Sequence, residues 1–400
     1  MDVYLMNKNI PVIKLVGENF IEDIGIPCFK ATAAIIEDRK RCPLCLSAFS
    51  DDLLVKNFNY WFEKRNISKK RVDLPSRPIE FEELPHYFSF SDQYWIKYNA
   101  NETWDDLSFF SDNVINNKKW ETFGNIIFSK NLHNIETLKA SSNTPDITTG
   151  GVLKKRWKFD GNKSILIKSM SKEFGQEPLN EILATKFLIK LNCINFVHYN
   201  LYAEGYELCC KCNNFITPNT ELIPAQQVYY SIPMSKEEAQ MSESERIYNH
   251  LIRAIKTHNI PNAIEFIDNM IRVDRLMLNF DRHLNNFGFI RNVNNGNFIE
   301  PAPLFDFGNC FFEGPNDKRK QLFAEREEEL FKSQRINPLK DDFVAQFVKE
   351  VDEIDILDNK KKASIITKFK KNNLYVKQRY AGIENRNRDK GIVQTAAIDI

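Results

Sequence analysis

The sequence lacks an excess of charge of either sign. Its 400 residues include 55 Lys and Arg against 54 Asp and Glu, which gives a formal net charge of +1. A protein with so little net charge has no field strong enough to bind nucleic acid non-specifically over its whole surface. The composition does not exclude a local basic patch, but we expect no direct binding of nucleic acid.

Long apolar runs are also missing. No stretch of about 18 uninterrupted apolar residues occurs, so we expect no transmembrane helix and no membrane partner. The N-terminal segment contains Asp2 and Lys8 and is not followed by a small-residue cleavage site, which argues against a signal peptide. The 8 cysteines are few for this length and irregularly spaced, and they indicate a reduced, cytoplasmic setting.

One pair of cysteines has a spacing that needs an interpretation of its own. Cys42 and Cys45 form a C-x-x-C motif, which can be half of a zinc site or a redox motif. A zinc site needs a second pair of ligands, and the candidates Cys209, Cys210 and Cys212 lie far away in a predicted strand. Small apolar cysteines fill cores well, so we predict that no metal is bound here.

Hydrophobic residues, by contrast, are plentiful. They make up 42% of the chain, aromatic residues make up 12%, and 31 residues are phenylalanine. This is enough to build real cores, and the length fits two or three domains. A polar run at 140–146 suggests a boundary. We therefore divide the chain into a mixed N-terminal region (1–138), a strand-rich region (139–217) and a helical region (218–400).

The middle region has an order of elements that suits phosphate binding. A turn with Thr149, Gly150 and Gly151 precedes two strands, the second of which ends in Lys168, and Glu181 falls in the first turn of the next helix. Glycine-turn N–H groups can approach phosphates, a nearby lysine can neutralise them, and a helix glutamate can hold that lysine by an ion pair. The predicted elements are strands over 152–159, 164–168, 196–202 and 206–212 and a helix over 177–191.

Three polar residues of the helical region suggest a metal site and a base. Asp281 and Asn286 lie on a loop that leads into a strand, and Asp306 follows the partner strand, 297–305, of a predicted hairpin. Because a hairpin brings its ends together, Asn286 and Asp306 should lie within a few ångströms of each other. Their oxygens would suit Mg²⁺. Asp281, on the same loop, can accept a proton from an attacking hydroxyl.

The neighbours of this loop have a different predicted role. Arg282 and His283 are expected to brace the loop rather than to touch a substrate. Asp274 resembles the start of the same motif but lacks the asparagine at the right spacing. We therefore place it on the preceding helix with a structural role.

These motifs resemble those of a known family. The D-R-H-x-x-N motif at 281–286 and the L-F-D-F-G segment at 304–308 are similar to those of HipA-like serine/threonine kinases, known as toxins of bacterial toxin–antitoxin pairs and their relatives. The resemblance covers about residues 140 to 315. Upstream segments with the same resemblance are 149–157, 165–168, 177–181 and 212–217, the last being similar to the hinge between two lobes.

The resemblance implies an α+β, bilobal protein-kinase-like (HipA-like) fold with a small β-rich N-lobe, a helical C-lobe and an extra N-terminal mixed α/β region. It implies ATP and Mg²⁺ as cofactors, Asp281 as catalytic base, and Asn286 and Asp306 as metal ligands. Lys168 would bind the α- and β-phosphates, and Glu181 would orient it. The residues implied to bind the nucleotide are Thr149, Gly150, Gly151, Lys154, Lys168, Glu181 and Phe215.

The sequence departs from the family pattern in two places. Members of the family carry a phosphorylatable serine in the phosphate loop, which switches activity by autophosphorylation. Here the choice among several hydroxyls stays open: Ser141, Ser142, Thr144, Thr148 and Thr149. The usual N-terminal subdomain is not clearly matched, so an antitoxin contact there also stays open. Segments 91–96 and 104–106 resemble a clostridial-type branch of the family.

Three functions compete. We favour a protein serine/threonine kinase, a HipA-like toxin or a relative of one, that phosphorylates a Ser or Thr hydroxyl of a protein substrate. Whether it has a small helix-turn-helix antitoxin as partner stays open. A phosphoinositide-type lipid kinase also carries D-R-H-x-x-N and D-F-G, but such enzymes are typically much larger. A non-catalytic pseudokinase in a repressor complex is the third. Intact Lys168, Asp281, Asn286 and Asp306 argue against it, since a decayed site should have lost at least one of them.

Overall fold

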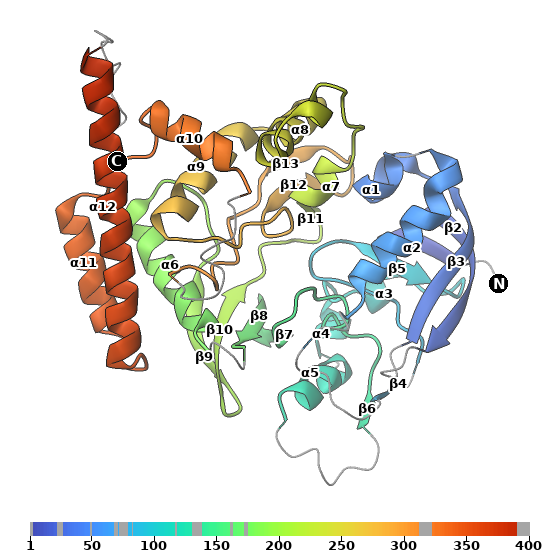
Figure 1. Ribbon diagram of the computed structural model, residues 1–400. Helices are drawn as coiled ribbons and strands as arrows, with labels where there is room; N and C mark the ends of the chain where they lie inside the picture. The colour runs from blue at the N-terminus through green and yellow to red at the C-terminus, as the bar shows by residue number, and fades with distance from the viewer. Residues whose placement is uncertain are drawn as a thin grey trace.

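The structure is a computed structural model with an α+β fold, as the sequence predicts. Most strands precede residue 225, and most of the long helices follow it (Figure 1). The residues that it describes are 3–21, 27–48, 50–67, 71, 79–81, 83–116, 118–129, 138–160, 163–171, 175–311 and 322–389.

The N-terminal region is built on an antiparallel sheet of order β3-β2-β1-β5. Helix α2 packs on this sheet because Phe58 and Phe62, one helical turn apart, both meet the ring of Phe29 edge-on. Residues 51–65 are helical throughout, with the first turn in the tighter 3₁₀ form. The elements of this region are β1 (Val3–Asn7), β2 (Ile10–Ile21), β3 (Pro27–Ile36), α1 (Leu44–Ser47), α2 (Leu54–Arg65), β4 (Ile79–Phe81), β5 (Tyr94–Lys97), α3 (Trp104–Leu107), α4 (Asp112–Asn116), α5 (Thr122–Ile127) and β6 (Leu138–Ala140).

The middle region is a second antiparallel sheet, of order β7-β8-β10-β9, with one helix. Alternate residues of β8 face opposite sides, so Ile165 and Ile167 pack on the N-terminal core while Leu166 packs with Cys210 and Cys212. The cysteines of β10 thus fill cores, as predicted. The elements are β7 (Lys155–Asp160), β8 (Lys163–Ser169), α6 (Glu177–Leu191), β9 (Tyr199–Glu204) and β10 (Glu207–Asn213).

Helix α6 joins the middle region to the helical region. It is apolar around most of its surface, and Phe187 is fully buried among the rings of Phe343, Phe347 and Phe369. Figure 1 shows α6 beside α11 and α12 at the left of the molecule. The remaining elements are β11 (Thr220–Pro224), α7 (Ala225–Tyr229), α8 (Glu243–Thr257), α9 (Ala263–Leu276), β12 (Gly288–Asn292), β13 (Phe298–Pro301), α10 (Ala324–Lys332), α11 (Asp341–Asp352) and α12 (Asn359–Asp389), and β11, β12 and β13 form one sheet.

A buried arginine connects the N-terminal region to this last sheet. Arg291 on β12 donates through Nε to Glu221 on β11 at 2.7 Å, and both side chains are at most 4% exposed. Its Nη2 donates to the carbonyl of Cys42 at 3.1 Å and to the hydroxyl of Tyr94 at 2.9 Å. One guanidinium therefore holds two regions together and neutralises a carboxylate inside the protein.

We expect the Arg291→Met variant to lose about 3–5 kcal/mol of unfolding free energy, because it leaves the Glu221 carboxylate buried without its cation. The midpoint of urea-induced unfolding would show the loss. The Arg291→Met/Glu221→Leu double variant should recover much of the lost unfolding free energy, since no unpaired charge is then buried at this site. Equal midpoints for the single and double variants would contradict this account.

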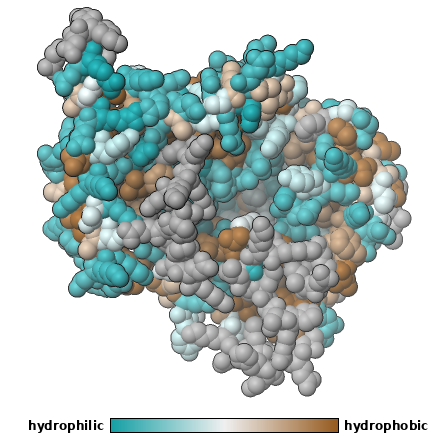
Figure 2. Space-filling model, viewed as in Figure 1, coloured by the Kyte–Doolittle hydropathy of each residue, from teal (hydrophilic) through white to brown (hydrophobic). Residues whose placement is uncertain are grey.

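The surface is mostly hydrophilic on the face shown in Figure 2. Hydrophobic residues gather at its right-hand edge, over β2 and β3, which carry the exposed side chains of Val16, Ile21 and Ile35. Among the described residues, no helix combines the length and apolar character needed to cross a membrane.

Candidate active site

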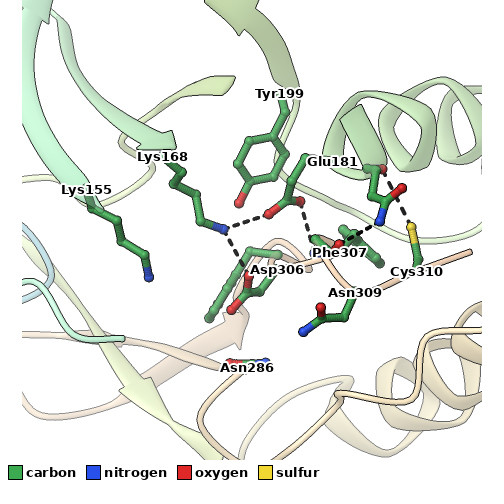
Figure 3. A network of polar contacts seen from close by, with 12 residues as sticks. Lys155, Lys168, Glu181, Tyr199, Asn286, Asp306, Phe307, Asn309 and Cys310 are labelled. Atoms are coloured by element: carbon green, nitrogen blue, oxygen red, sulfur yellow. Dashed lines mark hydrogen bonds and ion pairs between the residues drawn. The ribbon is translucent and has the colours of Figure 1, made fainter. Parts of the chain in front are cut away.

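Three charged side chains from distant segments meet at one end of the middle sheet. Lys168 lies on β8, Glu181 on α6, and Asp306 five residues after the end of β13. The Lys168 ammonium donates to Glu181 Oε1 at 2.6 Å and to Asp306 Oδ1 at 3.0 Å (Figure 3). The Lys168 and Glu181 side chains are buried, and that of Asp306 is 33% exposed. The structure thus brings together three residues that the sequence places up to 138 positions apart.

The electrostatics of this network fix its charges. Burial alone would lower the pKa of Lys168, but the carboxylates of Asp306 and Glu181 outweigh burial and hold that pKa well above its usual value. Burial would raise the pKa of Asp306, but the ammonium groups of Lys168 and Lys155 hold it well below its usual range. At neutral pH the site therefore keeps a fixed cation beside a fixed carboxylate.

Two consecutive residues of α6 hold the backbone that presents Asp306. Glu181 Oε2 accepts a hydrogen bond from the Phe307 N–H at 3.0 Å, and Asn180 Nδ2 donates to the Gly308 carbonyl at 2.7 Å. Asp306 itself has φ +65°, a left-handed conformation that costs a non-glycine residue about 1–2 kcal/mol. Strain of this kind persists only where surrounding contacts enforce it, and it concentrates at functional sites.

Arg282 joins the loop at 279–286 to the segment that leads to the D-F-G sequence. Its Nη1 donates to the carbonyls of Asn286 and Phe305, both at 2.6 Å. Its Nε and Nη2 donate to the buried carboxylate of Asp274 at 2.9 and 3.1 Å. Asp274 lies on α9, the preceding helix. The structure therefore confirms that Arg282 braces the loop and that Asp274 has a structural role.

The strand predicted over 297–305 is shorter than expected. Strand β13 ends at Pro301. The Ala302 N–H still donates to the Gly288 carbonyl at 2.9 Å, but Pro303 has no N–H group with which to extend the ladder. Leu304 instead pairs with Phe196 in an isolated parallel bridge. This bridge and Arg282, rather than a continuous hairpin, fix the backbone just before the D-F-G sequence.

Asn286 and Asp306 provide oxygen atoms suited to a divalent cation. Asn286 Nδ2 donates to the backbone carbonyl of Asp281 at 2.9 Å, which leaves Oδ1 as the atom that can face a cation. Figure 3 shows the Asn286 and Asp306 side chains as neighbours, in agreement with the bonds from Arg282 to both backbone segments. An ionised carboxylate and an amide oxygen are hard ligands of the kind that Mg²⁺ takes together with waters and phosphate oxygens. The residues present therefore fit this metal.

Asp281 has a partner that the sequence analysis did not identify. Its Oδ2 accepts a hydrogen bond from Asn309 Nδ2 at 2.6 Å. Asn309 directly follows the D-F-G sequence, but 28 residues separate it from Asp281, and no spacing rule connects the two. Only the folded chain shows this contact.

The glycine turn lies against the same end of the sheet. Gly151 has φ +95°, a conformation that glycine adopts without strain. The hydroxyl of Thr149 donates to the Pro145 carbonyl at 2.8 Å and accepts from Trp157 Nε1 at 2.9 Å, so it anchors the turn. At Gly150 there is open space where a side chain would begin. The turn is thus firmly held at Thr149 and open at Gly150.

The structure does not bring Lys154 to the site, which corrects the sequence prediction. Its ammonium pairs with Glu207 at 2.5 Å and lies over the ring of Phe128. Lys155, the next residue, is directly opposite Lys168 in the register of β7 and β8. Because successive residues of an extended chain point to opposite sides, only one of the two neighbouring lysines can face the site, and it is Lys155.

Lys155 is a second cation at the site. Its Nζ donates to the Gly150 carbonyl of the glycine turn at 3.0 Å, and Figure 3 shows its side chain near that of Lys168. Burial and the positive charge of Lys168 lower the pKa of Lys155 to about 8. Lys155 is therefore mostly charged at neutral pH but loses its proton in mildly alkaline solution.

Phe215 lies beside the site in an apolar cluster. Its ring stacks on Phe305, with centroids 6.1 Å apart and an interplanar angle of 27°. Phe305 directly precedes Asp306, and Val197 and Cys212 belong to the same cluster. A half-buried aromatic surface next to the charged network suits a nucleotide base, but contact of Phe215 with a nucleotide stays a prediction.

The hydroxyls of the loop before the glycine turn are engaged or buried. Ser141, Ser142 and Thr144 are at most 7% exposed. Thr148 and Thr149 both donate to the Pro145 carbonyl, and Thr148 also donates to the Phe88 carbonyl. Phosphorylation of any of these groups would require the loop to leave this conformation.

The C-x-x-C motif carries neutral thiols. Burial raises the pKa of both Cys42 and Cys45 to about 12. The Cys42 thiol donates to the Val12 carbonyl at 3.5 Å. Zinc and disulfide chemistry both use the thiolate, which these surroundings disfavour.

Comparison with known proteins finds sequence similarity to a bacterial kinase. No known family model matches it. It is 30% identical over 114 residues to the serine/threonine-protein kinase CtkA of Helicobacter pylori, a match that covers 28% of this chain and 34% of CtkA. The matching segment thus spans about a third of that relative's length.

Two solved structures are also similar. The H. pylori proinflammatory kinase CtkA aligns with a TM-score of 0.45 and 18% identity, covering 60% of this chain and 94% of CtkA. HipA of Shewanella oneidensis MR-1, solved with HipB and operator DNA, aligns with a TM-score of 0.46 and 10% identity, covering 98% of this chain and 100% of HipA.

Proposed function

We propose that this protein is an ATP- and Mg²⁺-dependent serine/threonine protein kinase of the HipA-like type, which transfers the γ-phosphate of ATP to a hydroxyl of a protein substrate. The observation that carries the proposal is the buried network of Lys168, Glu181 and Asp306 beside the loop of Asp281 and Asn286. A fixed cation, a metal-binding carboxylate and a base are the parts that phosphoryl transfer requires. The match to CtkA supports the proposal.

Each residue of the site has a distinct part in this reaction. Lys168, oriented by Glu181, would bind the α- and β-phosphates. Asn286 and Asp306 would hold Mg²⁺, which supplies positive charge to the phosphate oxygens when bound. Asp281 would take the proton of the acceptor hydroxyl. At the same time the hydroxyl oxygen would bond to the γ-phosphorus, and the bond between that phosphorus and the leaving ADP oxygen would break. Burial of the Lys168 side chain leaves its charge weakly screened, so it would act strongly on the phosphates.

The two neighbouring lysines provide a matched test of nucleotide binding. We expect Lys155→Ala to weaken ATP binding about tenfold, because a cation that faces the phosphates is lost. Lys154→Ala should leave ATP affinity within about twofold of wild type, since Lys154 pairs with Glu207 away from the site. Calorimetric titration of both variants with ATP and Mg²⁺ would measure the difference.

The same lysine gives ATP binding a pH dependence. Lys155 is protonated below its pKa of about 8, so its attraction for phosphate is present at pH 7 and fades as the pH rises toward 9. ATP affinity should fall over this interval in the wild type and stay flatter in Lys155→Ala. Parallel pH profiles for the two proteins would contradict this assignment.

Incubation of the protein with γ-labelled ATP, Mg²⁺, a mixture of bacterial proteins and phosphoinositide vesicles tests the reaction class. Label on protein serine or threonine is expected. Label on lipid would favour the phosphoinositide-type reaction, and label on neither would favour the non-catalytic module. Mass spectrometry of the protein itself would identify any autophosphorylated hydroxyl.

A small helix-turn-helix antitoxin is the partner that we propose with this activity. Its support is the resemblance of the motifs to HipA-like kinases. The clostridial-type branch stays a prediction from the same resemblance, and the cytoplasmic setting stays a prediction from the cysteine content. Co-expression with the neighbouring reading frame, followed by purification of this chain, would test the partner. Recovery of this chain alone would count against it.

A further inference from the structure

We infer that Asn309 is a positioning residue for Asp281, which holds the carboxylate in the orientation needed to take a proton. The inference rests on the proposed function, because it assigns a task to the base of that reaction. Its starting point is the 2.6 Å hydrogen bond from Asn309 Nδ2 to Asp281 Oδ2. A short bond to a carboxylate is among the stronger hydrogen bonds in proteins.

The backbone around Asn309 is fixed by its neighbours and not by its own side chain. The Gly308 carbonyl accepts from Asn180 Nδ2 at 2.7 Å, and the Cys310 thiol donates to the Asn180 carbonyl at 3.6 Å. Gly308 and Cys310 are buried, while Asn309 between them is exposed. Asn180 of α6 therefore holds the chain on both sides of Asn309, from which the Asn309 amide extends to Asp281.

This arrangement links the base to the metal-binding segment. Asp306 and Asn309 lie in one short segment, which Glu181 and Asn180 hold from α6. Through Asn309 the same segment contacts Asp281, which lies on a separate loop. The position of the base is thus set relative to Asp306, and not only by its own loop.

The hydrogen bond from Asn309 acts by fixing the orientation of the Asp281 carboxylate. With Oδ2 engaged by Asn309, proton transfer would use Oδ1, and rotation of the side chain would lose this geometry. Proton transfer is sensitive to misplacement of the base, and an error of about 1 Å can reduce a rate on the order of 100-fold. In the proposed function the nucleotide phosphates are bound by Lys168 and Lys155, so ATP binding should not depend on this bond.

The test uses variants at position 309. Their steady-state rates are measured on the protein that takes up label from γ-labelled ATP in the experiment described above. We expect Asn309→Ala to lower kcat about 10- to 100-fold with ATP affinity within about twofold of wild type. Asn309→Asp, an isostere, should lower kcat at least as far, because a second carboxylate repels Asp281. Asn309→Gln keeps the amide donor and should recover part of the loss. Asn200→Asp makes the same chemical change on exposed strand β9 and should leave kcat unaltered.

Thermal unfolding midpoints close to wild type would show that the variants are folded. Wild-type kcat in Asn309→Ala and Asn309→Asp would overturn the inference. A loss of ATP affinity equal to the loss of kcat would also overturn it, since Asn309 would then act on the nucleotide. Absence of transfer by the wild-type protein would instead defeat the proposed function, and the inference would fall with it.

Discussion

Replacement of Asp281 by alanine should reduce phosphate transfer about 10²- to 10⁴-fold and leave ATP binding nearly unchanged. The base acts only when the acceptor hydroxyl attacks, so its loss removes an interaction of the transition state and not of bound nucleotide. The structure supports this separation, because Asp281 contacts Asn286 and Asn309, while Lys168 pairs with Glu181 and Asp306. Single-turnover transfer and calorimetric ATP binding, measured on the same preparation, would show it.

Two further variants sharpen this experiment. Asp281→Asn keeps the shape of the side chain and removes its basicity, so it should be as inactive as Asp281→Ala. Glu300→Gln removes an exposed carboxylate on β13 and serves as the control for loss of one negative charge. Transfer at the wild-type rate by Asp281→Asn would exclude Asp281 as the base, and another group would have to take the proton.

Local patterns were enough to predict the elements that carry the charged network. The helix expected over 177–191 has those bounds in the structure, because Pro178 suits its first turn and Asn192, in the left-handed conformation, ends it. Lys168 and Glu181 follow from their places on a strand and on this helix. The fold class followed from the family resemblance, which rests on short motifs that can be recognised in the sequence alone.

Features that depend on register were harder to predict. Lys154 and Lys155 are chemically identical, and a shift of one residue exchanges the side of the strand that each faces. The register of β7 on β8, which places Lys155 opposite Lys168, decides between them. A sequence pattern that contains two adjacent lysines carries no information on this choice.

Contacts between distant segments could not be predicted from local sequence patterns. The bridge of Leu304 to Phe196 replaces the end of the expected hairpin, although the missing N–H group of Pro303 could have indicated that β13 stops early. The bond of Asn309 to Asp281 offers no such signal. Such contacts arise from packing of α6 against the D-F-G turn, which only the folded chain defines.

Asp306→Asn should weaken binding of Mg²⁺-ATP at least tenfold, about 1.4 kcal/mol, because the anionic metal ligand is lost. Asparagine is preferable to alanine here, since Asp306 has φ +65° and asparagine tolerates this conformation better. The variant also keeps the Lys168 cation paired with Glu181, so the network loses one charge without collapsing.

The effect on metal-free ATP separates a metal ligand from a general contact. Without Mg²⁺, the Asp306 carboxylate repels the phosphates, and its low pKa keeps it ionised at neutral pH. Asp306→Asn should therefore bind ATP in EDTA at least as tightly as the wild type while binding Mg²⁺-ATP more weakly. Equal weakening in both solutions would mean that Asp306 supports the nucleotide site through Lys168 alone. Because the two hypotheses give opposite signs in EDTA, calorimetry in the two solutions decides between them.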